Sequence, residues 1–364
     1  MDEVRVNLAD RSYSILIGRE LLKTAGNIFK ERGITGKILI VTNPTVAGWY
    51  LEPLQQSLTE AGYQVKSAMI PDGEEYKSLE QASSLYDQMV EGKYDRKSVI
   101  VALGGGVIGD LAGFAAATYM RGIGFIQVPT TLLAQVDSSI GGKVAVNHPR
   151  GKNLIGAFHQ PSLVLTDIDT LETLPERELS CGMAEVVKHG VILDENYFRL
   201  ILAELDDIRR AAPGTMSWIV AGSCQIKARV VEQDEKETGL RAILNFGHTI
   251  GHALESITNY TIYKHGEALA LGMLAAVKIA AEMKMVRQPG LDDLLFQVCQ
   301  GLALPVRING IRAQDIYEAL ALDKKVALGQ LRWILPENLG QVVVCNNVPP
   351  QLVTQVLQEM GAIS

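Results

Sequence analysis

The segment NFGHTIGHALE at residues 245–255 contains two histidines, His248 and His252, four residues apart. On a helix this spacing puts both imidazoles on one face, as in the H-E-x-x-H helix of zinc metalloproteases. Thr249 stands where such a protease has its glutamate, which argues against proteolysis. The spacing alone therefore favours His248 and His252 as a pair of metal ligands.

Three further residues could complete a metal site. His265 and Glu267 begin the next expected helix, and Glu185 lies in the apolar segment CGMAEVVKHG, where an unpaired charge is costly. Two imidazoles and a carboxylate with one open position form the ligand set of a catalytic zinc ion. The alternative is that each histidine is a hydrogen-bonded structural residue, and three histidines within 18 residues favour the metal site over it.

A glycine-rich turn is the second chemical feature of the sequence. In VIVALGGGVIGDLAGF, Gly104, Gly106 and Gly109 match G-x-G-x-x-G between an expected strand and an expected helix. Such glycines let the backbone approach a pyrophosphate, and the helix N-terminus supplies free N–H donors. The motif follows the third or fourth strand instead of the first, so Asp72, at the end of an earlier strand, is the candidate for binding a ribose. The alternative is a turn in which the glycines serve packing only.

Residues 119–161 combine hydroxyls, paired glycines and charged side chains, and we expect loops here instead of regular secondary structure. The Gly-Gly-Lys and Gly-Lys-Asn sequences could present an ammonium group and backbone donors to an oxyanion, and Arg121 adds a potential bidentate partner. Solvated loops are the alternative. We favour an anion-binding pocket because several cationic groups cluster within a chain whose net charge is −7.

Composition limits the class of protein. A chain of 364 residues with 47% hydrophobic and 21% charged residues predicts a globular protein of two domains. The N-terminus lacks a signal-peptide pattern, and the longest apolar run, at residues 268–277, is half a membrane span. Four separated cysteines without a C-x-x-C pair fit a reducing cytoplasm, and the acidic charge argues against nucleic-acid binding.

The periodicity of apolar residues predicts an α/β fold with two domains. An N-terminal hairpin is expected at residues 4–18, with further strands at 37–42, 64–70, 98–103, 125–129 and 162–166. Helical patterns at 45–61, 78–92 and 106–118 separate these strands, which indicates a parallel sheet. Helices then dominate, at 183–205, 213–235, 246–257, 265–285 and 289–301, before a strand at 332–336 and a helix from about 350. We expect a Rossmann-like parallel-sheet domain at 1–180 and a mostly α-helical, metal- and substrate-binding domain at 181–364.

Five segments together resemble the 3-dehydroquinate synthase family of sugar phosphate cyclases. They are GGGVIGDLAGFAAATYMRG, VPTTLLAQVDSSIGGKVAVNHPRGKNLIGAFHQP, LETLPERELSCGMAEVVKHG, RAILNFGHTIGHALE and HGEALALGM, and the likeness spans roughly residues 70–336. It implies a cytoplasmic, homodimeric enzyme that uses NAD and Zn²⁺, with Co²⁺ as the alternative ion. The implied reaction of the shikimate pathway converts 3-deoxy-D-arabino-heptulosonate 7-phosphate to 3-dehydroquinate and phosphate, with a hydride taken up by NAD and later returned.

The resemblance also assigns residues. It implies Glu185, His248 and His265 as metal ligands, and it makes His252 a catalytic or substrate-contacting residue, against the spacing argument. The implied catalytic and substrate contacts are Asp137, Lys143, Asn153, Lys188, Lys227, Arg241, Asn245 and His252, with Arg121 reaching across a dimer interface. The implied NAD contacts are Asp72, Gly73, Glu74, Glu75, Tyr76, Lys77, Gly106, Val107, Ile108, Gly109, Asp110, Thr130, Thr131, Lys143, Lys152, Thr170, Leu171, Glu172 and Thr173. A late phosphate-binding lysine corresponds to Lys324 or Lys325.

Three alternative functions stay open at this point. A metal-dependent polyol or alcohol dehydrogenase of related fold would not need so many cationic groups and would accumulate NADH. Another sugar phosphate cyclase is closer in chemistry, but the set of Arg241, Asn245 and His252 favours a carboxylated substrate. A non-catalytic nucleotide-binding protein would bind no metal at stoichiometric level.

Overall fold

The computed structural model describes residues 1–237, 239–326 and 331–364, and for residues 321–326 it describes the course of the helix only. The chain forms two compact units, one of Met1–Leu174 with Met216–Lys236 and one of Pro175–Thr215 with Glu237–Ser364. The first division falls at 174/175 instead of the expected 180/181, and residues 216–236 pack with the first unit. The two functional domains expected from the sequence stay a prediction.

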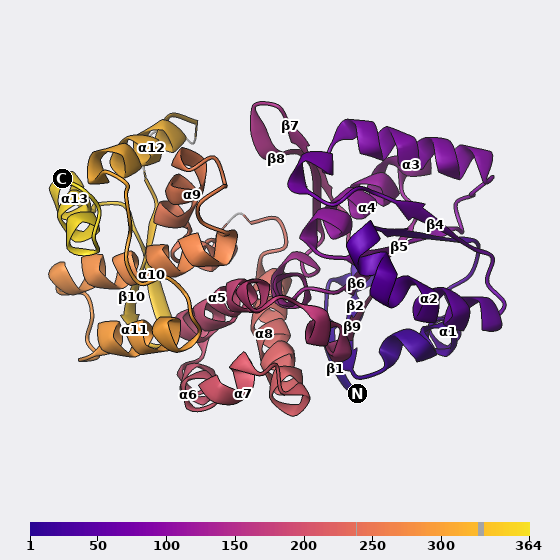
Figure 1. The fold of residues 1–364 in the computed structure, drawn as a ribbon, viewed down its shortest axis with the longest axis horizontal. Helices are drawn as coiled ribbons and strands as arrows, with labels where there is room; N and C mark the ends of the chain where they lie inside the picture. Colours follow the sequence, from indigo (N-terminus) through magenta and orange to yellow (C-terminus); the bar gives the residue numbers. More distant parts are fainter. Residues whose placement is uncertain (238, 327–330) are drawn as a thin grey trace. The chain divides into compact units, whose positions relative to one another are not determined.

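A seven-stranded sheet forms the centre of the first unit, in the order β1-β2-β9-β6-β5-β3-β4 (Figure 1). Its strands are β1 Asp2–Val6, β2 Tyr13–Gly18, β3 Ile38–Thr42, β4 Val65–Met69, β5 Val99–Gly104, β6 Gly124–Pro129 and β9 Leu163–Asp167. Only the β1–β2 hairpin pairs antiparallel, and the other pairs within this sheet are parallel. Strands β3 and β5 are buried throughout, as parallel strands covered on both faces must be. The α/β class and the predicted strands are confirmed.

Helices cover both faces of this sheet (Figure 1). Leu22 and Phe29 of α1 Leu21–Glu31, with Leu54 of α2 Pro44–Glu60, share one apolar core with Ile40 of β3. Leu85 of α3 Leu79–Glu91 belongs with α4 Gly106–Thr118 to the core on the other face. This three-layer arrangement leaves the turn from β5 to α4 at the carboxyl edge of the sheet, where ligands bind in open α/β folds.

A hairpin of β7 Lys143–His148 and β8 Gly151–Phe158 lies in the segment that we expected to form loops. That expectation was wrong for residues 143–158. Val144 and Val146 of β7 are buried against the α3–α4 core, so apolar packing overrides the local abundance of glycine and polar residues. The segment also contains the short helices η3 Tyr119–Arg121 and η4 Ala134–Ser138.

The second unit is mostly helical, and α10 lies in its core. Its elements are α5 Glu176–Leu193, α6 Glu195–Ala203, α7 Leu205–Arg209, η6 Leu240–Asn245, α9 His248–Ile257, α10 His265–Glu282, α11 Leu291–Gly301, α12 Ala313–Val326, β10 Trp333–Asn338, β11 Gln341–Cys345 and α13 Pro350–Glu359. Helix α8 Pro213–Gln233 begins in this unit and continues into the first. Helix α10 packs against α5, α9, α11 and α13 and is apolar on all sides, which is the pattern of a core helix.

Two glycines of α10 allow this close packing. A Cβ atom at Gly272 would lie 1.9 Å from the Gly247 carbonyl oxygen, and one at Gly266 would lie 2.2 Å from the Cys181 carbonyl oxygen. Larger residues at these positions would push α10 away from α5 and from the start of α9. The glycines therefore bring together three segments that each carry a predicted metal ligand.

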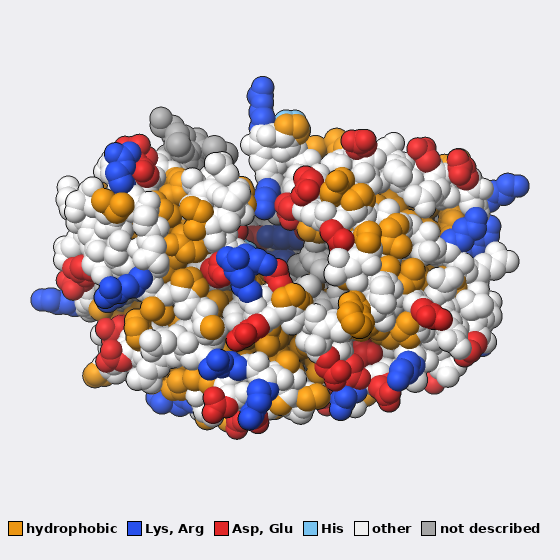
Figure 2. All heavy atoms as spheres, viewed as in Figure 1, with side chains coloured by type: hydrophobic (Ala, Val, Ile, Leu, Met, Phe, Trp, Pro, Cys, Tyr) orange, Lys and Arg blue, Asp and Glu red, His pale blue; other side chains and the backbone are white. Residues whose placement is uncertain are grey.

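Figure 2 shows acidic and basic side chains interspersed on the face it presents, without a continuous basic stripe among the described residues there. Within residues 1–237, 239–326 and 331–364, every helix is too short or too polar to cross a bilayer.

Candidate metal centre and nucleotide-binding segments

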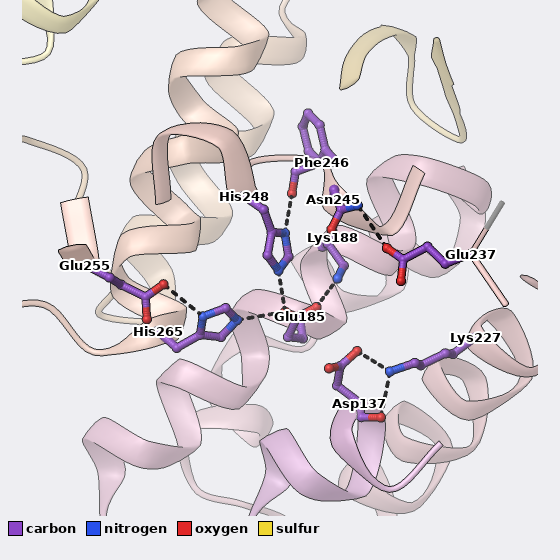
Figure 3. A network of polar contacts seen from close by, with 10 residues as sticks. All are labelled: Asp137, Glu185, Lys188, Lys227, Glu237, Asn245, Phe246, His248, Glu255 and His265. Carbon is purple, nitrogen blue, oxygen red and sulfur yellow. Dashed lines mark hydrogen bonds and ion pairs between the residues drawn. The ribbon is translucent and has the colours of Figure 1, made fainter. Parts of the chain in front are cut away.

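Glu185, His248 and His265 converge in the second unit (Figure 3). The Glu185 Oε1 atom lies 3.1 Å from His265 Nε2 and 3.5 Å from His248 Nε2. Ligand atoms bound tetrahedrally to Zn²⁺ at about 2.0–2.1 Å are separated by about 3.3 Å. The three side chains therefore have the types and the spacing of ligands to one ion.

Helix starts hold both histidines in place. Gly247, with φ 79°, precedes α9 and makes His248 its first residue. His265 is the first residue of α10, where the Glu267 carboxylate accepts a hydrogen bond from the Lys264 backbone N–H at 2.9 Å. Glu267 also bonds Arg177, so this carboxylate, a candidate ligand from sequence, serves to fix the start of α10.

Burial and neighbouring charges set the protonation states of the three groups. Burial raises the pKa of Glu185, but Lys188, His265 and His248 lower it by more, so the carboxylate stays ionised. Burial and the Lys188 charge hold the pKa of His248 well below its usual value, which leaves a neutral nitrogen ligand. Burial lowers the pKa of His265, but the Glu185 and Glu255 carboxylates outweigh it and raise the pKa to about 10. The group thus holds a proton on His265 that a metal ion would have to displace.

His252 and Glu255 form a second group with His265, in which the ligand atoms again lie within 4.8 Å of one another. His252 is exposed on α9, with its ring centroid 5.1 Å from that of His248. Helical spacing alone paired His248 with His252, whereas Glu185 is joined by His248 and His265. Helical spacing within α9 cannot reveal this group, because His265 lies on α10 and the Glu185 carboxylate on α5.

Other predicted site residues of the second unit are Lys188, Arg241 and Asn245. Lys188, one helical turn after Glu185, is buried and forms an ion pair with it (Figure 3). Arg241 is buried in η6, and Asn245 at the end of η6 donates a hydrogen bond to Glu237 at 3.3 Å. The side chains of Lys324 and Lys325 lie outside the described residues, so the choice between them is untested.

The glycine-rich turn of the first unit has the predicted strand–turn–helix context. Gly104 ends β5, and Gly105, which has no side chain that could cap the helix, precedes α4. A Cβ atom at Gly109 would lie 2.8 Å from the Gln127 side chain, and one at Gly105 would lie 3.2 Å from Thr131. The Thr130 backbone N–H donates to the Gly104 carbonyl at 3.0 Å. The structure therefore brings the predicted NAD residues of the turn, namely Gly106, Val107, Ile108, Gly109 and Asp110, next to Thr130 and Thr131.

The segment from Asp72 to Lys77 is tied to this turn by buried polar contacts. The Lys77 ammonium bonds Asp110 Oδ2 and Asn153 Oδ1, each at 2.5 Å, and its side chain is 5% exposed. Asp72 accepts hydrogen bonds from Asn43 and Thr45, which holds the carboxylate at the ends of β3 and β4. Lys77 thus joins residues assigned to NAD with one assigned to substrate.

Neighbouring contacts position the remaining members of this segment. Asn147 of β7 donates to the Glu74 carboxylate at 2.8 Å, and Lys152 lies 3.9 Å from the same carboxylate. Glu75 and Tyr76 belong with Glu74 to the short helix η2 Glu74–Tyr76, which Gly73 precedes with φ 130°. Asn147 was not selected from the sequence, because a lone asparagine in an apparent loop gives no signal.

The TLET segment lies in η5 Ile168–Thr173, after β9. Thr170 and Leu171 are buried there. Tyr50 bonds the Thr173 hydroxyl at 2.6 Å, and Arg19 lies 3.6 Å from Glu172. The buried Thr170 and Leu171 therefore contribute to packing, whereas Glu172 and Thr173 are exposed to solvent.

Asp137 and Lys227 form a close pair within the first unit (Figure 3). The Lys227 ammonium, from α8, bonds both Asp137 Oδ1 and the Asp137 carbonyl oxygen at 2.6 Å, and Lys227 is buried. Lys143 begins β7, and Arg121 is exposed in η3 with φ 69°. The predicted substrate residues are thus divided between the units, with Asp137, Lys143, Asn153, Lys227 and Arg121 in the first and Lys188, Arg241, Asn245 and His252 in the second.

Family models match most of the chain. The model described as the N-terminal part of 3-dehydroquinate synthase matches residues 67–181, and the model of its C-terminal part matches residues 182–326. A relative named 3-dehydroquinate synthase from Nostoc punctiforme is 50% identical over 362 residues, covering 98% of this chain and 99% of the relative.

Two solved structures have similar folds. A 2-deoxy-scyllo-inosose synthase, complexed with carbaglucose-6-phosphate, NAD⁺ and Co²⁺, is 28% identical with a TM-score of 0.89, covering 99% of this chain and 100% of the other. A 2-epi-5-epi-valiolone synthase from Streptomyces hygroscopicus, with NAD⁺ and Zn²⁺ bound, is 27% identical with a TM-score of 0.88, covering 97% and 98%.

Proposed function

The chain belongs to the 3-dehydroquinate synthase family, and we propose that it converts 3-deoxy-D-arabino-heptulosonate 7-phosphate to 3-dehydroquinate and phosphate. The reaction eliminates phosphate and closes a carbocycle, so the enzyme is a cyclase and, more narrowly, a carbon–oxygen lyase. The observation that carries this proposal within the structure is the convergence of Glu185, His248 and His265 on one position.

The residues present fit both implied cofactors. Glu185, His248 and His265 would hold Zn²⁺ or Co²⁺, because the donor types suit either ion and the separations of 3.1 and 3.5 Å match a tetrahedral site. The glycine turn and the segment from Asp72 to Lys77 would hold NAD. When bound, the ion supplies a Lewis acid and NAD supplies a reversible hydride acceptor.

We assign recognition of the doubly anionic substrate to cationic side chains. Arg241 is buried, and a planar guanidinium can bind a carboxylate through two parallel hydrogen bonds. Lys188 and Lys227 are buried ammonium groups, each already paired with a carboxylate, which fixes their positions before substrate binds. Lys143, Asn153, Asn245 and His252 are the remaining assigned contacts.

Electrostatic stabilisation of a departing phosphate requires cationic groups that are already oriented. The ion pairs of Lys188 with Glu185 and of Lys227 with Asp137 supply this orientation.

Assembly and location stay predictions. We propose a homodimer in which Arg121 contacts substrate bound by the partner subunit, and a cytoplasmic location. Exposure of Arg121 and its position in a short helix are compatible with such a contact.

The direct test is release of inorganic phosphate from the heptulosonate phosphate by the purified enzyme loaded with Zn²⁺ and NAD. We expect release to stop after a chelator removes the ion and to return with added Zn²⁺ or Co²⁺. Glucose 6-phosphate and sedoheptulose 7-phosphate, tested in parallel, distinguish other sugar phosphate cyclases. Turnover of either sugar phosphate in preference to the carboxylated substrate would contradict the assignment.

A further inference from the structure

Glu255 is a buried carboxylate that neither the predicted site nor the family assignment uses. It lies on α9, seven residues after His248 and three after His252, so helical geometry puts all three side chains on one face. Its side chain is 10% exposed, and its Oε2 atom lies 3.4 Å from His265 Nδ1 (Figure 3).

The two ring nitrogens of His265 face different carboxylates. Nε2 faces Glu185 at 3.1 Å, within the group that also contains His248, whereas Nδ1 faces Glu255 at 3.4 Å. His248 has the same arrangement, because its Nε2 faces Glu185 at 3.5 Å and its Nδ1 lies 3.3 Å from the Phe246 carbonyl oxygen. In both rings, therefore, an acceptor stands at Nδ1 and leaves Nε2 directed at the candidate ion position.

We infer that Glu255 is a positioning residue that accepts a hydrogen bond from His265 Nδ1–H and so selects Nε2 as the nitrogen that binds the metal ion. The inference rests on the proposed metal-dependent function. A carboxylate behind a metal-binding histidine fixes the ring and its tautomer and makes the ligand nitrogen more basic. Glu255 acts on the ion only through His265.

The alternative is that Glu255 binds the ion itself, since Glu255, His252 and His265 also form a group of potential ligands. The two arrangements use opposite nitrogens of His265, so one histidine cannot serve both with a single ion. Removing Glu255 separates them, because a positioning residue leaves three ligands in place and a ligand does not.

The test measures Zn²⁺ affinity by chelator competition, on metal-free protein without NAD or substrate. We expect Glu255→Ala to weaken Zn²⁺ binding about 10- to 100-fold, the usual effect of losing such a partner. Glu255→Gln should recover most of this loss, because its amide oxygen still accepts from Nδ1–H and its shape is nearly unchanged. Once saturated with Co²⁺, both variants should give the visible spectrum of the wild type, because the ligands are the same.

Glu267→Gln is the matched control. This carboxylate lies two residues after His265 and bonds Arg177 and the Lys264 backbone, so its loss disturbs the start of α10 without touching the imidazole. We expect lower thermal stability and a loss of Zn²⁺ affinity smaller than that of Glu255→Ala, because the imidazole keeps both of its carboxylate contacts.

Three results would overturn the inference. If Glu255→Ala binds Zn²⁺ within about twofold of the wild-type affinity, Glu255 does not affect the ion, because a positioning residue should change the affinity about 10- to 100-fold. A changed Co²⁺ spectrum in Glu255→Ala, with affinity as low as that of His265→Ala, would make Glu255 a ligand. Equal losses of Zn²⁺ affinity in Glu255→Ala and Glu267→Gln would reflect general loosening of α9 and α10 instead of a lost contact with His265. If phosphate release fails while the Glu255 effect persists, the proposed reaction is wrong and the positioning role stands.

Discussion

Replacing His265 with alanine tests the candidate metal centre most sharply. The substitution removes one of three converging ligands and leaves the buried Glu185 carboxylate without its contact at 3.1 Å. Loss of a partner outside the ligand set already weakens binding about 10- to 100-fold. Loss of a ligand should therefore weaken Zn²⁺ binding by more than about a hundredfold, which corresponds to about 2.7 kcal/mol.

The assay is elemental analysis of dialysed protein, with affinity from chelator competition. His252→Ala is the control on the same helix, since His252 is exposed and lies outside the group around Glu185. It should retain stoichiometric Zn²⁺ and lose turnover. If His265→Ala and His252→Ala lose zinc equally while His248→Ala retains it, the ion lies among His252, Glu255 and His265, and our assignment is refuted.

Two further substitutions test the proposed roles of buried charges. Arg241→Lys should lower kcat/KM roughly 10- to 100-fold, because lysine lacks the second arm of a bidentate contact worth about 1.5–3 kcal/mol. NAD affinity should be unchanged, since the predicted NAD contacts belong to the first unit. A normal kcat/KM would show that Arg241 has a structural role only. Lys77→Met should destabilise the fold by about 3–5 kcal/mol near neutral pH by leaving Asp110 unpaired in the interior. Burial already raises the pKa of Asp110 despite Lys77, so the folded variant binds a proton more readily than the unfolded chain does, and its deficit should shrink as pH falls towards 5. A deficit that does not change with pH, measured by urea unfolding at pH 5 and 8, would contradict this explanation.

The periodicity of apolar residues predicted the strands and helices whose side chains are buried continuously or on one regular face. Strands β3, β5 and β9 are buried at every residue, and α4, predicted at 106–118, begins and ends at Gly106 and Thr118. The run predicted at 183–205 contains two helices, because Asp194 leaves the helical conformation and its side chain caps α6. The β7–β8 hairpin was missed because its stability comes from packing of Val144 and Val146 on distant residues.

The candidate metal ligands could be predicted from their spacing only in part, because contacts between distant segments are not visible in the local sequence. His248 and His252 share a helix, so their spacing is visible in the sequence, whereas the contact of His248 with Glu185 depends on the packing of α5, α9 and α10. Glu255 could have been found, since H-x-x-x-H-x-x-E puts three potential ligands on one helical face. Its partner, the second nitrogen of His265, is set by tertiary structure alone.

The central claim is that this chain is a cyclase whose hydride transfer leaves no net oxidation. The most direct measurement counts phosphate and 3-dehydroquinate formed per molecule of NAD, with the heptulosonate phosphate in large excess over both enzyme and cofactor. The account predicts equal amounts of the two products, many turnovers for each NAD, and no lasting NADH absorbance. One NADH accumulated for each substrate consumed, with turnover ending when NAD is exhausted, would contradict it and identify a dehydrogenase.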